Sequence, residues 1–301
     1  MANTENQVIE IIPTLLVGDN AFDPANIPSC TLCIEMGEQQ IRFCIVRDEQ
    51  MECIWLEDYV LEVGLNADEV FEKIRRIFLG HVLWSSQNWK NVRLAVNSSI
   101  FSLVPDSVFE ERSTGDYLAF AAGNPVSKTE KVLHHELPLV HARNVFSLPE
   151  TWYDWIINHF GSAQISFYHL TSPLIIGSLV SHIEHQELRI VSVYFEKDHF
   201  TIIVSESRQL MLCNRFRYNQ TQELVYIILF TLSQVGFSPE EVKVLCYGQI
   251  DESADVYAEL SHFFPNLQIG SRPSTLKYSR PCAEVPGHRY FGLFNTYLVS
   301  S

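Results

Sequence analysis

Short apolar runs separated by polar turns fill two regions of the chain, a pattern that predicts strands joined by hairpins. In the first region the runs are followed by a helical pattern and by one more buried strand. These elements lie at residues 31–36, 41–46, 51–56, 66–80 and 92–96. The spacing predicts an antiparallel three-stranded meander, then a helix that crosses over to a fourth strand.

The same order of elements returns in the second half of the chain. Its three strands, helix and strand lie at residues 189–195, 200–205, 209–216, 219–236 and 242–248. Sequence identity between the two regions is negligible, so only the pattern repeats. We therefore predict an α/β fold with mixed sheets and two related subdomains, 1–186 and 187–301, each with a three-stranded meander and crossover helices.

The starts of three predicted helices have the spacing of a capping box, in which a polar side chain precedes Glu or Gln by three residues. The pairs are Asn66 with Glu69, Ser147 with Glu150, and Asn219 with Gln222. Gly236 follows the last apolar turn of its helix, where a left-handed residue commonly ends a helix.

Composition is that of an ordinary globular protein, with 47% hydrophobic and 19% charged residues. The 36 acidic and 21 basic residues give a formal net charge of −15, and no Lys/Arg-rich run interrupts this excess. Such a surface repels a phosphate backbone, so we expect no direct nucleic-acid binding. A basic protein partner would suit the charge.

The first residues and the cysteines indicate the compartment. MANTENQVIEIIPTLL lacks the basic and long apolar segments of a signal peptide. The longest uncharged stretch, roughly residues 165–183, contains Pro173 and is a poor membrane span. The seven cysteines are an odd number and fit reduced thiols better than a disulfide framework. We expect a cytoplasmic protein without a membrane span.

Three stretches of the sequence resemble one bacterial family. SIFSLVPDSVFEERSTGDYLAF, HARNVFSLP and RQLMLCNRFRYNQTQELVYIILFTLSQVGFSPEEVKVLCYGQID are similar to domain of unknown function 3822, which is known mainly from Bacteroidetes. The similarity extends from about residue 10 to about residue 295, and Asn214-Arg215-Phe216 and Tyr218 are its most individual marks. The resemblance implies the duplicated actin-like (ribonuclease H-like) ATPase fold of actin and the sugar kinases, and it brings no established activity.

The resemblance directs attention to two hairpins that bind phosphate in active members of this fold. Each carries Asp-x-Gly: the carboxylate organises metal and water, and the glycine lets backbone amides approach the phosphates. The first hairpin here reads Glu35-Met36-Gly37-Glu38, where Glu38 adds a negative charge. The second reads Tyr194-Phe195-Glu196, so a phenol and a bulky acid replace Asp and Gly. We therefore predict that ATP hydrolysis is absent.

Three positions remain as candidates for a vestigial phosphate or nucleotide site: Glu35, Gly37 and Gly248. Gly248 is what is left of a glycine pair that lies near the adenosine in active members. The simpler interpretation of Gly37 is a tight turn that needs a positive φ, which glycine adopts without steric cost. We favour that interpretation and keep a residual ligand contact as the alternative.

Cys30-Thr31-Leu32-Cys33, with Cys44 and Cys53 on neighbouring strands, offers half of a zinc site. Structural zinc sites usually have a second close pair, which is missing here, and cysteines on strands also suit a core as small apolar residues. The sequence holds no Gly-x-Ser-x-Gly elbow, Walker loop or Gly-x-Gly-x-x-Gly fingerprint. We expect no metal and assign no catalytic residue.

These observations favour a catalytically silent pseudo-ATPase that acts as a cytoplasmic protein-binding or assembly factor and needs no cofactor. In strand and helix order the second half also resembles actin-like cytoplasmic components of pilus and secretion machines, an analogy of fold only. The alternative is a conformational switch that holds ATP and Mg²⁺ in the interdomain cleft with little or no hydrolysis. A third, weaker hypothesis is a metal-dependent enzyme that uses the cysteine and histidine clusters.

Overall fold

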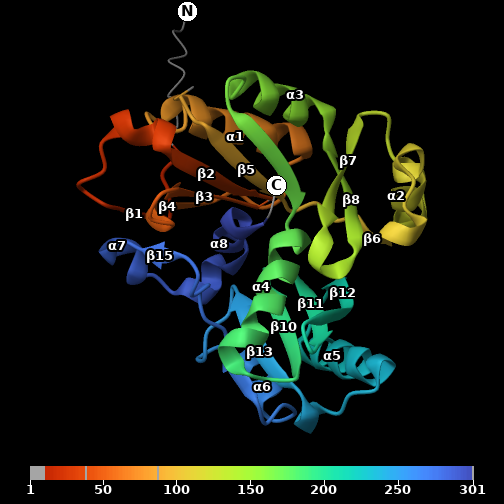
Figure 1. Ribbon diagram of the computed structural model, residues 1–301. Coiled ribbons are helices and arrows are strands. Elements are labelled where there is room, and N and C mark those ends of the chain that lie inside the picture. The colour runs from red at the N-terminus through yellow and green to blue at the C-terminus, as the bar shows by residue number, and fades with distance from the viewer. Residues whose placement is uncertain (1–10, 38, 87, 300–301) are drawn as a thin grey trace, which may run out of the picture.

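A computed structural model describes residues 11–37, 39–86 and 88–299 (Figure 1). Within these residues the chain forms one seven-stranded, one five-stranded and one three-stranded sheet. The two larger sheets belong to the two regions in which the sequence pattern repeats.

The first sheet has the strand order β1-β4-β3-β2-β5-β9, with β15 also paired to β4. Its strands are β1 (Leu15–Gly18), β2 (Cys30–Met36), β3 (Gln40–Arg47), β4 (Glu52–Val60), β5 (Asn91–Val96), β9 (Gln164–His169) and β15 (Lys277–Tyr278). β2, β3 and β4 form the antiparallel meander, and β5 and β9 extend it in parallel. The predicted meander and the strand after it are confirmed.

The second sheet repeats this arrangement, with the order β12-β11-β10-β13-β14. Its strands are β10 (Arg189–Phe195), β11 (His199–Glu206), β12 (Gln209–Arg217), β13 (Lys243–Gly248) and β14 (Leu267–Ile269). The first three are antiparallel neighbours and the last two are added in parallel, as in β4-β3-β2-β5-β9. The chain therefore has a duplicated α/β fold with mixed sheets.

A small antiparallel sheet, which the sequence pattern did not reveal, follows β5. It has the order β6-β8-β7, and helix α2 packs on it. The elements are β6 (Phe101–Pro105), α2 (Thr114–Ala122), β7 (Glu130–Leu137) and β8 (Ala142–Pro149). In Figure 1 this unit stands to the side of the first sheet. Every residue of β7 except its last is at least partly exposed, so it lacks the apolar run of a buried strand.

Helices cover one face of each large sheet. α1 (Ala67–Gly80) and α3 (Glu150–His159) share an apolar core with the first sheet. α5 (Thr221–Val235) and α6 (Asp255–Ser261) share a second core with the second sheet. Short 3-10 helices connect these elements, at Pro24–Ser29, Asp106–Val108, Glu111–Ser113, Pro138–Val140, Pro239–Glu241 and Gly287–Tyr290.

The opposite face of each large sheet is covered by one further helix. α8 (Phe291–Leu298), near the end of the chain, packs on β2, β3 and β5 of the first sheet. α4 (Thr171–His185) packs on β10, β11 and β12 of the second sheet. The two helices also contact each other at the centre of the molecule (Figure 1). A short helix, α7 (Arg280–Ala283), precedes α8 in the chain. The subdomain boundary between residues 186 and 187 stays a prediction.

Two of the predicted helix ends are confirmed. The Asn66 side chain accepts hydrogen bonds from the backbone N–H groups of Asp68 and Glu69, and the Glu69 carboxylate accepts one from the Asn66 N–H. Gly236 ends α5 with φ of 77°, in the left-handed region.

The other two capping predictions are wrong. Gln220, not Asn219, precedes the first turn of α5, and the Asn219 N–H instead donates to the carboxylate of Glu223. Ser147 lies inside β8, and α3 begins directly after Pro149 without a side-chain cap. In both places the flanking strand or turn extends further than the apolar pattern indicates, which moves the start of the helix.

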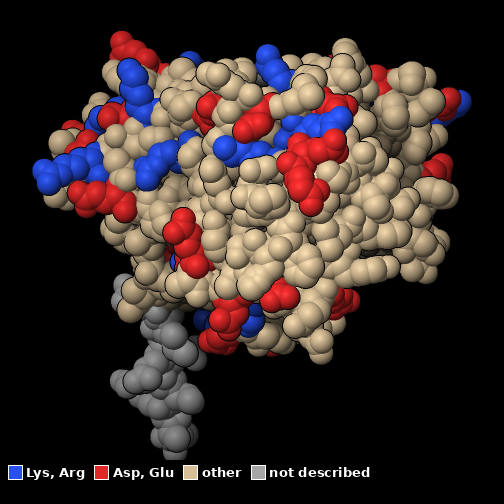
Figure 2. Space-filling view, turned by 90° about the horizontal axis from the view of Figure 1, so that it is seen from below, with Lys and Arg blue, Asp and Glu red and all other residues tan. Residues whose placement is uncertain are grey.

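The surface seen from below carries acidic and basic side chains close to one another (Figure 2). The acidic excess therefore does not form one continuous patch on that face. Among the described residues, no helix combines the length and the apolar character that crossing a bilayer requires.

Candidate functional site

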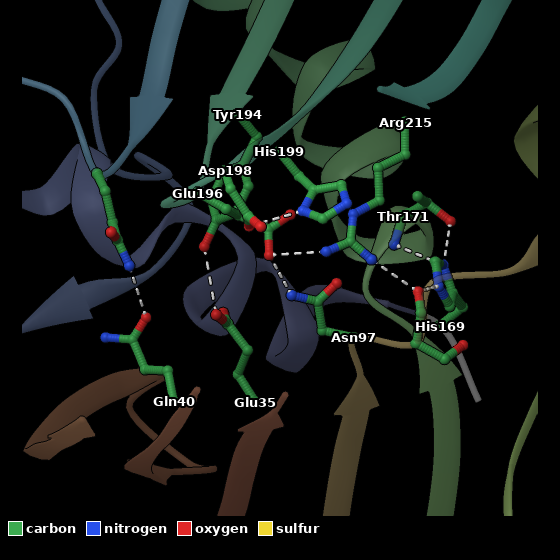
Figure 3. A network of polar contacts seen from close by, with 12 residues as sticks. Glu35, Gln40, Asn97, His169, Thr171, Tyr194, Glu196, Asp198, His199 and Arg215 are labelled. Carbon is green, nitrogen blue, oxygen red and sulfur yellow. Dashed lines mark hydrogen bonds and ion pairs between the residues drawn. The ribbon is translucent and has the colours of Figure 1, made fainter. Parts of the chain in front are cut away.

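The ends of the two hairpins that correspond, by the family resemblance, to phosphate-binding hairpins of active members meet between the halves of the molecule (Figure 3). Glu35 lies near the end of β2, and Tyr194 lies near the end of β10. The Tyr194 hydroxyl and Glu35 Oε1 are 3.2 Å apart. Arg42, the β3 residue opposite Glu35, donates from Nη1 to Glu35 Oε1 at 2.8 Å and to the Tyr194 oxygen at 2.9 Å. A guanidinium therefore joins the two hairpins.

These charged groups are removed from water. Glu35 is 6% exposed, Arg42 1% and Asp58 2%, and Asp58 pairs with Arg42 Nε at 3.4 Å. Burial raises the pKa of Glu35, against the attraction of Arg42. Burial and the Glu35 charge also raise the pKa of Tyr194 well above its usual value, so its hydroxyl stays protonated. A cation supplied by the protein itself therefore lies between the ends of the two hairpins.

A second group of polar contacts crosses between the halves beside the first. Asn97, at the end of β5, donates from Nδ2 to Glu196 Oε1 at 2.5 Å. Arg215, on β12, pairs with the same oxygen at 3.2 Å and donates from Nη1 to the Ser98 carbonyl at 2.9 Å. We call these four residues, Asn97, Ser98, Glu196 and Arg215, the clasp.

His169 supports the clasp from inside the first half. Its Nδ1 accepts from the Thr171 backbone N–H at 3.2 Å, so the ring proton is on Nε2, which donates to the Ser98 carbonyl at 3.0 Å. Burial lowers the pKa of His169 to about 3, which keeps the ring neutral. Asn144 donates in turn to the Thr171 hydroxyl at 2.8 Å. The Ser98 carbonyl therefore receives donors from both halves.

The space left at the hairpins is small. A cavity of about 110 Å³ lies there, bordered by Glu35, Gly37, Tyr194, Glu196 and Gln249 among others. Drug-sized ligands and cofactors occupy pockets of about 300–1,000 Å³. Beside it, Gln249 donates to Gln40 across the gap at 3.1 Å.

Of the three predicted positions, Glu35 and Gly37 line the small cavity together, whereas Gly248 lies against Phe195 and does not line it. Gly37 borders the small cavity, yet its φ lies outside the left-handed region, so the expected positive φ is wrong. A Cβ there would lie 3.4 Å from the Asn97 Cβ, an ordinary contact. Gly248 does have a positive φ, of 82°, and a Cβ on it would lie 2.2 Å from the Phe195 carbonyl oxygen. It lets β13 approach β10 beside the second hairpin. Glu38 lies outside the described residues.

Sequence reasoning missed Arg42 and the residues of the clasp other than Glu196. A charged side chain inside the apolar run of β3 was a usable signal for Arg42, because a buried charge needs a partner. Arg215 stood among the individual marks of the family resemblance, but nothing in the sequence indicated that it reaches the loop after β5.

The cysteines of the proposed zinc half-site lie in the core. Cys33, Cys44 and Cys53 pack with Cys282 and α8 residues on the inner face of the first sheet, and Cys30 packs on the outer face. All seven cysteines are free. Among the described residues no group of three or more His, Cys, Asp or Glu side chains is arranged to hold a metal ion. The expected absence of metal stays a prediction.

A larger, mainly apolar cavity of about 520 Å³ lies between the first sheet with α1 and the small sheet with α2. Apolar residues that line it include Met36, Val70, Ile100, Ala122, Val126 and Trp152. Among the described residues that line this cavity, Glu130 is the charged one. Gly37, Asn97 and Ser99 border both this apolar cavity and the small one at the hairpins.

Residues 19–267 match the family described as protein of unknown function (DUF3822). The chain belongs to this family. The predicted family is thus confirmed, while the comparison with curated proteins gives no match. The predicted actin-like fold is confirmed by similarity to solved structures.

Two solved structures show the fold of this DUF3822 protein. A Bacteroides thetaiotaomicron protein, described as having an actin-like ATPase fold and unknown function, is 18% identical with a TM-score of 0.71; the match covers 87% of this chain and 95% of that one. The PilM–PilN type IV pilus biogenesis complex gives a chain that is 11% identical with a TM-score of 0.63, covering 89% and 97%. At such identities the likeness concerns the fold alone.

Proposed function

We propose that this protein is a catalytically silent member of the actin-like fold that binds another protein in the cytoplasm. The observation that carries the proposal is a contrast between two cavities. The one at the hairpins is small, and two ion pairs, Glu35–Arg42 and Glu196–Arg215, lie on its border, whereas the apolar cavity has the volume of a binding site.

The ion pairs at the hairpins support catalytic silence. A nucleotide phosphate needs backbone amides that approach it, and often a metal held by a carboxylate. Here Glu35 is engaged by Arg42, and Tyr194 and Glu196 replace the second carboxylate and glycine. Opening this site would separate buried charges, which is strongly unfavourable when one partner remains unpaired.

The apolar cavity supports binding of a partner segment. Its lining combines apolar side chains with polar groups such as Asn97, Ser99 and Asn124, a composition typical of sites that bury an apolar anchor and orient it with a few hydrogen bonds. The net charge of −15 and Glu130 in the lining favour an anchor flanked by basic residues. A solved protein of similar fold is described in complex with a second protein, PilN. The free thiols of all seven cysteines agree with a reducing compartment.

The test uses two neighbouring alanines of α2 as matched variants. Ala122 lines the apolar cavity, whereas Ala121 is exposed and does not. Tagged wild-type protein and the Ala122→Trp and Ala121→Trp variants are purified from the native cells, and bound proteins are identified. We expect a partner with the wild type and Ala121→Trp that is lost with Ala122→Trp. Equal recovery of the partner by both variants would place binding elsewhere and reject the cavity as the site.

A further inference from the structure

The loop at residues 97–100 belongs to both the apolar cavity and the clasp. All four residues line the apolar cavity, and Asn97 and Ser99 also border the small cavity at the hairpins. Through the Asn97 side chain and the Ser98 carbonyl the same loop makes the polar contacts to the second half. Any movement of the loop therefore changes both the wall of the apolar cavity and the polar contacts to the second half.

The start of the loop is fixed to the first sheet. The Asn97 N–H donates to the Met36 carbonyl, and the Val96 carbonyl accepts from Leu170 N–H, both at 2.8 Å. Beyond this point the position of the loop depends on side chains: His169 from the first half and Arg215 from the second both donate to the Ser98 carbonyl.

The contacts that Glu196 and Arg215 make with the loop are largely shielded from solvent. Glu196 and Arg215 are 17% and 12% exposed, so solvent screens their attraction less than at an open surface. Glu196 Oε1 receives both Asn97 and Arg215, while Glu196 Oε2 and Arg215 Nε are buried without a hydrogen-bond partner among the described residues. Two polar atoms of the clasp, both from the second half, therefore have no hydrogen-bond partner among the described residues in this arrangement.

We propose that the clasp couples binding in the apolar cavity to the contact between the two halves, with residues 97–100 as the shared element. This inference rests on the proposed docking function. In the closed arrangement Glu196 and Arg215 hold the loop in the position that shapes the cavity wall. Loss of the clasp releases the wall, and affinity for an apolar ligand falls because the cavity is no longer preorganised. By linkage, a bound partner strengthens the contact between the halves by the same factor.

The test measures binding of a neutral apolar dye, Nile red, by fluorescence titration of the full-length protein. Ala122→Trp defines the fraction of the signal that comes from the cavity, and Ala121→Trp is its control. Glu196→Ala and Arg215→Met then remove the clasp from the second half without changing a residue that lines the apolar cavity. Gln249→Ala removes a different contact between the halves, the one to Gln40. Unfolding temperatures establish that each variant is folded, and Glu196→Gln replaces Glu196→Ala if the latter is not.

We expect the cavity-specific dissociation constant to rise about fivefold or more in both clasp variants, the lower end of typical coupling between sites, and to stay within twofold in Gln249→Ala. Equal affinity in the wild type and the clasp variants would overturn the coupling and leave docking in the cavity intact. An equal loss of dye affinity in Gln249→Ala would also overturn the coupling through the clasp, because separation of the two halves as a whole would then explain the effect. Dye binding that is absent from the wild type, or retained by Ala122→Trp, would instead reject the apolar cavity and the proposed function with it.

Discussion

Arg42 shows how one residue changes the meaning of the first hairpin. It is buried between Glu35 and Asp58, and it also contacts the Tyr194 hydroxyl of the other half. The sequence of this hairpin alone indicates a phosphate site that has lost its binding residues. In the folded protein the same residues form an ion network that spans the two halves.

Removing Arg42 tests whether this network is closed to water. In Arg42→Met, Glu35 and Asp58 lose their shared partner, so we expect the free energy of unfolding to fall by about 3–5 kcal/mol in urea at pH 7. Adding Glu35→Gln should restore part of this loss, because one unpaired charge disappears. Arg75→Met, which breaks the exposed pair with Glu72, is the control and should cost at most about 1 kcal/mol. An Arg42→Met protein as stable as that control would mean that water already reaches the carboxylates.

Glu57 leads to a prediction about pH. Its carboxylate is fully buried and accepts from the Trp55, Tyr59 and Trp84 side chains, with His81 Nε2 at 3.1 Å. Burial alone would raise the pKa of Glu57, but these donors outweigh it and lower the pKa below 4.5. A folded-state pKa below the unfolded one gives stability that is present above the unfolded pKa and lost as pH falls through the folded pKa.

We therefore expect Glu57→Gln to be less stable than the wild type by about 1–3 kcal/mol at pH 7, because the donors lose a charged acceptor. Below about pH 4 the difference should shrink, since protonation removes the same charge from the wild type. Urea unfolding of both proteins between pH 3 and pH 7 measures the stability difference in both pH ranges. A difference that is constant across this range would assign the loss to packing and not to the carboxylate.

At the scale of elements, alternation and helical spacing were sufficient to predict both meanders and the helices α1 and α5, because those segments bury one face against a sheet. The small sheet was missed because β6 and β7 stay partly exposed, and because polar Arg143, Asn144 and Ser147 interrupt the apolar residues of the largely buried β8. α8 was missed because its residues, FGLFNTYL, are apolar on nearly every side, as expected of a helix enclosed between a sheet and α4. Neither the long-range packing of α8 on the first sheet nor the pairing of Arg215 with Ser98 leaves a local signal in the sequence.

The crossing of α4 and α8 depends on a close approach at Gly177. A Cβ at this position would lie 2.5 Å from a ring atom of Phe291 and 2.6 Å from Asn295 Nδ2. Gly177→Ala should therefore destabilise the protein by about 1–3 kcal/mol through overpacking, although alanine is the better helix former. Gly115→Ala, in α2 with nothing within 4 Å of the added Cβ, should be neutral or slightly stabilising. Thermal unfolding of the two variants tests this prediction. Equal unfolding temperatures would show that α4 and α8 move apart at Gly177 without loss of stability.

For the whole molecule, the packing of α4 against α8 and the ion network act in the same direction. α8, near the end of the chain, covers the first sheet and contacts α4, which covers the second sheet, and buried charges join the two halves at the hairpins. Moving one half relative to the other would uncover apolar surface and separate paired charges together. We therefore expect the halves to stay closed where an actin-like ATPase would open to admit its nucleotide.

This leads to the expectation that Mg-ATP has no effect on stability. A ligand present at 100 times its dissociation constant adds about 2.7 kcal/mol to the free energy of unfolding, which shifts the unfolding temperature by several degrees in a protein of this size. With Glu35 held by Arg42, and Tyr194 and Glu196 in place of the second carboxylate and glycine, we expect millimolar Mg-ATP to leave that temperature unchanged. Glu196→Ala, which breaks the clasp but leaves Arg42 in place, should behave the same way, because the guanidinium still occupies the site. A saturable stabilisation of the wild type by Mg-ATP that Glu35→Ala abolishes would show that the hairpins still bind phosphate, and the nucleotide-switch hypothesis would then replace catalytic silence combined with protein binding.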